Sequence, residues 1–226
     1  MTSNGRQRSE ILQFVASELL TLAPGRRFVA IDGVDGSGKS TFASELAEAL
    51  TSRPVIAISA DNFLNLREVR YRLGRTSPEG FWLDTYDYDT LREFVLEPLA
   101  PDGTGEYRAA ATDHVNNLRL EPVAVQAPAD SLVIVEGMFL HRDELAGRWD
   151  YSVFLDVPFA ETARRMHLRD GSNPDPEHPS MRRYVGGQRL YFQEAEPWSR
   201  ATRVIDNADP HRPTLLSPRE ARNRPR

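Results

Sequence analysis

The sequence predicts a three-layer α/β fold in which helices flank both faces of a mainly parallel sheet. Short apolar runs suited to buried strands alternate along the chain with segments whose apolar residues recur at helical spacing. The first of these runs leads directly into a glycine-rich loop, and a helix follows the loop. The 226 residues, 40% of them hydrophobic, can bury one full-sized core, so we expect a single domain over residues 1–217.

Local signals place the main elements in order. An amphipathic helix is expected over residues 9–22, and Pro24-Gly25 ends it. Buried strands are then expected at 28–32, 55–59, 132–135, 151–156 and 203–206, and further helices at 41–50, 89–96, 161–169 and 181–195. We expect the second of these strands to lie next to the first.

The remaining segments have weaker patterns. Residues 67–88 mix aromatic, Gly and Pro residues, which favours an irregular excursion over a binding cleft. Residues 106–126 are compatible with small accessory strands. Three prolines exclude a helix from 171–179, so we expect a mobile loop there. The polar, arginine-rich residues 218–226 are expected to form a disordered tail.

Composition excludes several classes of protein. A formal net charge of −5 argues against a general nucleic-acid binder. The absence of cysteine excludes disulfides and thiolate metal sites and favours a reducing cytoplasm. No apolar stretch has the length of a membrane span, and the N-terminus lacks a signal-peptide core. We therefore expect a cytoplasmic protein whose partner is a small molecule, with no nucleic-acid or membrane partner; a homo-oligomer stays open.

The octapeptide from Gly33 to Ser40 is a complete G-x-x-x-x-G-K-[ST] phosphate loop. All but one of the 28 basic residues are arginine, and the single lysine, Lys39, stands where a compact ammonium must reach between phosphates. Because strand, glycine loop and helix follow in the required order, we expect a P-loop NTPase-type fold. In such a loop the amides cradle ATP, Lys39 bridges the β- and γ-phosphates, and the Ser40 hydroxyl ligates Mg²⁺. The expected nucleotide contacts are Gly33, Val34, Asp35, Gly36, Ser37, Gly38, Lys39, Ser40 and Thr41.

Two carboxylates follow predicted strands. Glu136 ends the strand at 132–135, where open α/β sheets place their ligands, so we expect it to face the metal beside the phosphate loop. Asp61 follows the strand at 55–59 and can take the proton from an acceptor hydroxyl or hold Mg²⁺ through water. Each has a plainer alternative, namely a solvated strand-end acid for Glu136 and an Asx turn with Asn62 for Asp61.

With these motifs in this order, the chain resembles uridine kinases and their relatives, the phosphoribulokinase and bacterial pantothenate kinase group, over about residues 25–210. Many NTPases share the phosphate loop, whereas the other stretches are more specific. By this resemblance Asp61 is the catalytic base for a sugar hydroxyl, and Glu136 with Ser40 organises magnesium. The resemblance rests on Gly33 to Thr41, Ser59-Ala60-Asp61-Asn62-Phe63, Val133-Ile134-Val135-Glu136-Gly137 and Arg164-Arg165-Met166-His167-Leu168-Arg169-Asp170.

The same resemblance implies a lid over about residues 169–182. Arg165 and Arg169 match arginines at the start of that lid, which neutralise charge on the migrating phosphoryl group. From spacing alone, two arginines at i and i+4 share one helix face and are usually solvated surface residues. The loop from Asn207 to Pro210 matches the position where such kinases pack the adenine ring.

An aromatic and acidic cluster at 81–89 is the candidate acceptor site. Its rings and carboxylates suit stacking of a base and gripping of ribose hydroxyls, and they suit packing of a helical cap over the sheet equally well. We take Phe81, Asp84 and Tyr86 as acceptor contacts.

The stretch by which uridine kinases read the pyrimidine, Tyr-Asp-x-x-x-His-x-Arg, is not intact. Tyr107 matches and is a further candidate acceptor contact, but Arg108 and Thr112 replace the aspartate and histidine, and the arginine is missing. The remaining histidines lack metal-ligand spacing and are expected at the surface: His141, His167, His178 and His211.

Together these residues indicate an ATP- and Mg²⁺-dependent kinase that phosphorylates a hydroxyl of a small metabolite, with uridine or cytidine as the first expectation. Pantothenate, a ribosyl vitamin precursor, a sugar and a sugar phosphate are alternative acceptors. A nucleotide-dependent ATPase or switch that acts on a protein partner is the alternative outside this class.

Overall fold

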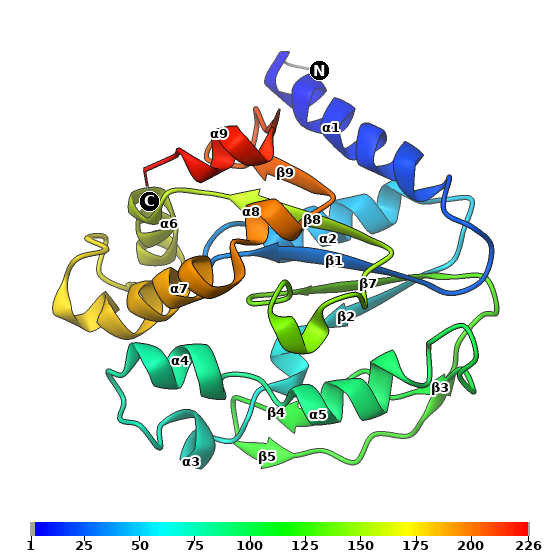
Figure 1. The fold of residues 1–226 in the computed structure, drawn as a ribbon, viewed down its shortest axis with the longest axis horizontal. Helices are drawn as coiled ribbons and strands as arrows, with labels where there is room; N and C mark the ends of the chain where they lie inside the picture. The colour runs from blue at the N-terminus through cyan, green and yellow to red at the C-terminus, as the bar shows by residue number, and fades with distance from the viewer. Residues whose placement is uncertain (1–2, 226) are drawn as a thin grey trace.

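A six-stranded sheet forms the middle layer of the computed structural model, which describes residues 3–225 (Figure 1). Its strand order is β10-β9-β8-β1-β7-β2. Only the pairing of β10 with β9 is antiparallel, so the expectation of a mainly parallel sheet is confirmed. The strands are β1 (Arg27–Gly33), β2 (Val55–Ser59), β7 (Leu132–Gly137), β8 (Tyr151–Asp156), β9 (Arg203–Asp206) and β10 (Thr214–Leu216).

The expectation that β2 lies next to β1 is wrong. β2 pairs with β7, and β7 lies between β2 and β1. A crossover between parallel strands can skip a position that a later strand fills, so chain order alone does not give the strand order. The consequence for the site is that Glu136, on β7, stands closer to the phosphate loop than the end of β2 does.

Alternating side chains on the strands build two cores. Val29 and Ile31 of β1 face α1 (Ser3–Leu19) and α2 (Lys39–Ala49) on one side of the sheet. Phe28 and Ala30 face the opposite core, which includes side chains of α6 (Phe159–Asp170), α7 (Arg182–Ala195) and α8 (Pro197–Arg200). The sheet is therefore covered on both faces, as predicted.

The segment at 67–88 is not irregular, which corrects the expectation. It contains α3 (Arg67–Arg70) and α4 (Pro78–Asp84), and α5 (Tyr88–Leu91) leads into the π-helical turn Arg92–Leu96. Side-chain caps start two of these helices, since Ser77 accepts from the amide of Gly80 and Asp87 accepts from that of Thr90. Helices this short leave no clear periodicity in a sequence. In Figure 1 they lie beside β2, away from α1 and α2.

Residues 106–126 form two accessory ladders, as expected. β3 (Glu106–Tyr107) pairs with β6 (Val125–Gln126), and β4 (Thr112–Asp113) pairs with β5 (Leu118–Arg119), both antiparallel. Short 3₁₀ turns occupy Ala60–Phe63, Asp143–Leu145 and Pro179–Met181. The proline-containing segment between α6 and α7 has no α-helix, which agrees with the sequence.

The tail beyond residue 217 is ordered as far as residue 225, where disorder was expected. It forms α9 (Pro218–Arg222), which begins with a capping box between Ser217 and Glu220. Arg224 then pairs with Asp206 at 2.6 Å and with Asp156 at 3.0 Å. The arginines that predicted a solvated tail instead attach it to the ends of β8 and β9.

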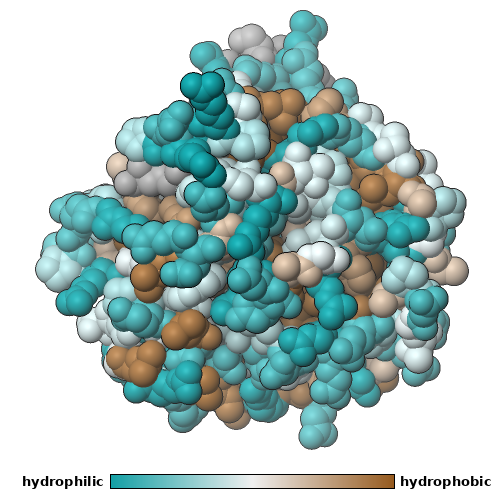
Figure 2. Space-filling model, viewed as in Figure 1, coloured by the Kyte–Doolittle hydropathy of each residue, from teal (hydrophilic) through white to brown (hydrophobic). Residues whose placement is uncertain are grey.

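The surface in Figure 2 is hydrophilic over most of the face shown, with apolar side chains in small separate areas. Within residues 3–225, no helix combines the length and apolar character that a membrane crossing would need.

Candidate functional site

A cavity of about 600 Å³ opens where β1, β2 and β7 end. It is lined by charged and polar groups from the phosphate loop, the ends of these strands and α6, with two methionines as its apolar wall. The lining residues are Asp35, Gly36, Gly38, Lys39, Ser40, Thr41, Asp61, Glu136, Gly137, Met138, Arg165, Met166 and Arg169. The cavity therefore brings together all the residues predicted for catalysis and metal binding.

The phosphate loop joins β1 to the N-terminus of α2. Gly36 and Gly38 have φ angles of 74° and 89°, and a Cβ on Gly36 would come within 2.9 Å of the Thr162 carbonyl oxygen. Lys39 is 9% exposed, and its Nζ donates to the Val34 carbonyl at 2.9 Å. The loop amides and the helix N-terminus thus form a site that favours phosphate.

Not every loop residue faces this site. Six of the nine predicted nucleotide contacts line the cavity, whereas Gly33, Val34 and Ser37 do not belong to its lining. Val34 and Ser37 are buried at 2% and 0% exposure. Their side chains fill the space beneath the loop, so any contact with a nucleotide would come from their main chain.

Glu136 lies beside the phosphate loop, as predicted. It pairs in register with Ile31 of β1 and Ser59 of β2, which fixes it between the two strand ends. Its Oε2 accepts from Ser40 Oγ at 3.1 Å and its Oε1 accepts from Ser59 Oγ at 2.5 Å. The alternative of an unattached strand-end acid is therefore excluded.

The oxygen atoms of Ser40, Glu136 and Asp61 suit magnesium. Mg²⁺ takes oxygen ligands and usually binds through one or two carboxylates together with substrate phosphates. Among residues 3–225, no cluster of three or more His, Cys, Asp or Glu side chains could hold a metal by itself. This set of donors fits an ion that arrives with a nucleotide, not a permanent metal centre.

Asp61 lies on the 3₁₀ turn after β2, and its carboxylate borders the cavity. Its Oδ1 accepts from the hydroxyl of Tyr86 at 2.8 Å, so a side chain and not an Asx turn orients it. Burial raises the pKa of Tyr86 well above its usual range, and the charge of Asp61 adds to this. Tyr86 therefore stays protonated as a donor.

Arg165 and Arg169, both on α6, also line the cavity. Arg165 donates to the carbonyls of Asn207 and Ala208 at 2.8 Å each and pairs with Glu161 at 2.8 Å. Arg169 is more exposed and lies 3.6 Å from the carboxylate of Asp35 in the phosphate loop. Both side chains reach the cavity, but Arg169 is 59% exposed and pairs with its neighbour Asp170 at 2.8 Å, so the explanation as a solvated surface residue stays open for Arg169.

Asn207, an expected nucleotide contact, does not belong to the lining of the cavity. Its side chain is 1% exposed, and its amide donates to the Ser37 carbonyl at 2.8 Å beneath the phosphate loop. Its location after β9 was predicted from the resemblance, but the side chain supports the loop and does not reach the cavity.

None of the four expected acceptor contacts belongs to the lining of the cavity. Phe81 packs edge-on against Phe139 and Tyr184, and the buried Asp84 forms an ion pair with Arg72. Tyr107 packs against the core from β3. These side chains pack the helical cap, which was the alternative explanation of the cluster.

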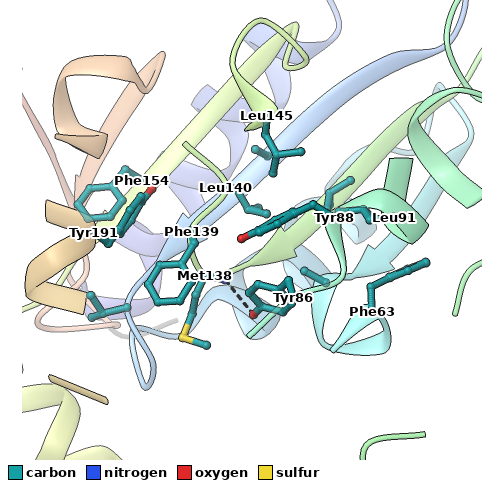
Figure 3. Close-up of a cluster of buried hydrophobic side chains, with 14 of the residues drawn as sticks. Phe63, Tyr86, Tyr88, Leu91, Met138, Phe139, Leu140, Leu145, Phe154 and Tyr191 are labelled. Carbon is teal, nitrogen blue, oxygen red and sulfur yellow. Dashed lines mark hydrogen bonds between the residues drawn. The ribbon is translucent and has the colours of Figure 1, made fainter. Parts of the chain in front are cut away.

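Tyr86 is the one of the four that touches a residue of the cavity wall, Asp61. It belongs to the cluster of buried side chains in Figure 3. Its hydroxyl also accepts a hydrogen bond from the amide of Met138 at 3.4 Å. The aromatic cluster at 81–89 therefore meets the site at one point, through the residue that orients Asp61.

His141 was expected at the surface, but it is 4% exposed. Its Nδ1 lies 2.6 Å from Oδ2 of Asp32, the residue before Gly33, and the Tyr191 hydroxyl donates to the same oxygen. Burial and the Asp32 carboxylate raise the pKa of Tyr191 well above its usual range. Sequence reasoning missed this cluster because its members come from three separate segments; a charged residue inside the first apolar strand was the one available signal.

Comparisons with known proteins agree with this fold. The AAA domain family matches residues 29–186. No curated protein matches the chain in sequence. A structure of a possible uridine kinase from Bacillus stearothermophilus is similar at a TM-score of 0.70 and 22% identity, covering 88% of this chain and 98% of that one.

Two further solved structures share the fold. A candidate fructose transport system kinase from a Silicibacter species has a TM-score of 0.64 and 23% identity, covering 81% of this chain and 95% of its own. D-glycerate 3-kinase from Cryptococcus neoformans has a TM-score of 0.53 and 13% identity, covering 84% of this chain and 88% of its own. At these identities the likeness establishes the fold, and the expected P-loop NTPase-type fold is confirmed.

Proposed function

Because this chain belongs to the AAA domain family and has the fold of P-loop kinases, we propose that it is an ATP-dependent kinase in the cytoplasm. It would transfer the γ-phosphate to a hydroxyl of a small metabolite. The observation that carries this proposal is the meeting of Lys39, Asp61 and Glu136 around one polar cavity. The names of the similar structures support the reaction class, since they are a possible uridine kinase, a candidate fructose transport system kinase and a D-glycerate 3-kinase.

Each residue would have a distinct part in this reaction. The loop amides and Lys39 would hold the triphosphate, and Asp61 would accept the proton of the attacking hydroxyl. Ser40 and Glu136 would hold Mg²⁺, which when bound neutralises charge on the phosphates. Arg165 and Arg169 would face the phosphates from α6, and residues from about 169 to 182 would close as a lid that excludes water.

A nucleoside such as uridine or cytidine remains the first acceptor to test. The resemblance to uridine kinases favours it. Because the pyrimidine-reading stretch near Tyr107 is altered, other hydroxyl acceptors are tested as well. Pantothenate, a ribosyl vitamin precursor, sugars and sugar phosphates belong to the same test. All of them offer a hydroxyl that Asp61 could deprotonate.

The test is ADP release from ATP and Mg²⁺ by the purified protein across a panel of these acceptors. We expect turnover that requires one class of acceptor and that Lys39→Ala abolishes, since the change removes the cation from the transferred group. Hydrolysis that proceeds at the same rate without any acceptor would contradict the kinase and favour an ATPase or switch.

A further inference from the structure

One peptide unit of the phosphate loop is held at both ends. The carbonyl of Val34 accepts from Lys39 Nζ at 2.9 Å, and the amide of Asp35 donates to Gln188 Oε1 at 3.0 Å. These two groups belong to the same peptide bond. Because a trans peptide is planar, its C=O and N–H point in opposite directions, and a bond at one end fixes the direction of the other.

Gln188 is built to hold this position. It lies on α7 and is 1% exposed, so its amide is shielded from water. Its Nε2 donates to the Tyr184 carbonyl at 3.0 Å, which fixes the amide orientation and presents Oε1 to Asp35. Rotation of the Val34–Asp35 peptide would break the bond to Gln188 and also turn the carbonyl away from Lys39.

The same helix holds the strand that leads into the loop. One turn beyond Gln188, the Tyr191 hydroxyl donates to Asp32, whose Oδ1 accepts from the amide of Gly33 at 2.7 Å. The proline-containing segment proposed as the lid runs directly into α7. α7 is thus attached to the phosphate loop through Gln188 and to the strand before it through Tyr191.

We propose that Gln188 is a positioning residue that orients the Lys39 ammonium for the nucleotide through the Val34–Asp35 peptide. This role deepens the proposed function and rests on it, because it takes Lys39 to contact the triphosphate. Gln188 itself touches neither substrate. Its loss would leave the Asp35 amide without this acceptor and free the peptide to rotate.

The test compares Gln188→Leu with Gln193→Leu, the same change at an exposed position of the same helix. Affinity for a non-hydrolysable ATP analogue with Mg²⁺ is measured by calorimetry. We expect Gln188→Leu to weaken binding about tenfold, because the freed peptide no longer holds the Lys39 ammonium in the orientation that the phosphates require. Gln193→Leu should bind like the wild type.

A second measurement separates positioning from general damage. Since Lys39 is the only lysine, ¹³Cε-lysine labelling gives a single lysine signal in NMR. We expect that signal to move in nucleotide-free Gln188→Leu and to keep its place in Gln193→Leu. If the Leu variant does not fold, Gln188→Met, which keeps the unbranched shape, replaces it.

The proposal requires both effects in the same variant. An unchanged lysine signal, or an affinity equal to that of Gln193→Leu, would overturn it while leaving the kinase proposal intact. A wild-type protein that does not bind the analogue at all would instead refute the proposed function.

Discussion

At the scale of single residues, the contact between Asp61 and Tyr86 is the one that bears most directly on proton transfer. The buried Tyr86 hydroxyl occupies Oδ1 of Asp61, and this oxygen therefore has a fixed direction. A general base needs such a fixed position, because proton transfer requires hydrogen-bond contact with the reacting hydroxyl. In the proposed reaction, the other oxygen of Asp61 would accept the proton.

We predict that Asp61→Asn leaves ATP binding nearly intact and lowers turnover by roughly 10²–10⁴, the usual contribution of a general base. The amide keeps the shape of the side chain and cannot accept the proton. Calorimetry and ADP release measure the two effects separately. Asp89→Asn, at an acid with 90% side-chain exposure, is the matched control, and near-normal turnover in Asp61→Asn would remove the base assignment.

Tyr86→Phe should lower turnover by about tenfold without a comparable loss of ATP affinity. The change removes one hydrogen bond to a charged group, which is worth about 1.5–3 kcal/mol. The ring itself keeps its packing against Tyr88 and Phe139 in the buried cluster of Figure 3, so the fold should persist. An unchanged rate at saturating acceptor would show that Asp61 keeps its orientation without this hydroxyl.

The residues predicted correctly stand directly after strands or inside the loop motif. Lys39, Asp61 and Glu136 could be placed because the ends of parallel strands meet at one edge of a sheet. Gln188 and His141 could not, since their partners lie far away in the chain and no local spacing marks them. Asn207 was placed at the right loop, but burial decides what its side chain does.

At the scale of elements, α6 brings two of its three arginines to the cavity, Arg165 and Arg169. Arg169 reaches the phosphate loop, whereas Arg164 pairs only within the helix, with Glu161 at 2.8 Å. The two residues therefore make a matched pair for testing what the cavity-facing side of α6 contributes.

We predict that Arg169→Ala lowers turnover by about 10² or more, with a smaller effect on ATP affinity. Charge on the migrating phosphoryl group is greatest during transfer, so a cation there acts mainly on the rate. Arg164→Ala should leave both quantities near the wild-type values. Equal rates for the two variants would return Arg169 to the class of solvated surface residues.

α1 is attached to the sheet through Glu18. Arg203 donates to its Oε2 at 2.9 Å and Tyr151 donates to the same oxygen at 2.6 Å. The hydrogen bond from Arg203 lowers the pKa of Glu18, against the opposing effect of burial. A lowered folded-state pKa stabilises the protein above the unfolded value of about 4.3, and this contribution is lost as pH falls through the folded value.

Glu18→Gln should therefore lower Tm by about 1–3 °C at pH 7, the range expected for a largely solvated ion pair. The difference from the wild type should shrink as pH falls below the unfolded value of about 4.3 and vanish once pH lies below the lowered folded-state pKa, because Glu18 is then protonated and uncharged like Gln. Thermal unfolding at several pH values measures this. A Tm difference that is constant with pH would show that the charge of the Glu18 carboxylate does not contribute to stability.

Long elements were predictable and short ones were not. The buried strands and α2, α6 and α7 carry strong periodicity, and the structure confirms all of them. The short helices of the cap begin at single capping residues, and the order of β2 and β7 depends on a crossover, so neither leaves a pattern in sequence. α9 formed where composition predicted disorder, because Arg224 finds two acids on neighbouring strands.

At the scale of the whole molecule, each layer of the fold provides a different part of the proposed active site. The sheet ends and α2 provide the nucleotide side, the cap provides Tyr86 behind Asp61, and α6 with α7 frames the remaining wall. The central claim is that one cavity presents a cation and two carboxylates to the same phosphate.

A crystal structure with Mg²⁺ and a non-hydrolysable ATP analogue tests that claim most directly. We predict that Lys39 Nζ contacts the β- and γ-phosphates and that the carboxylates of Asp61 and Glu136 face the γ-phosphate and its metal. A bound nucleotide with both carboxylates directed away from it would contradict the account.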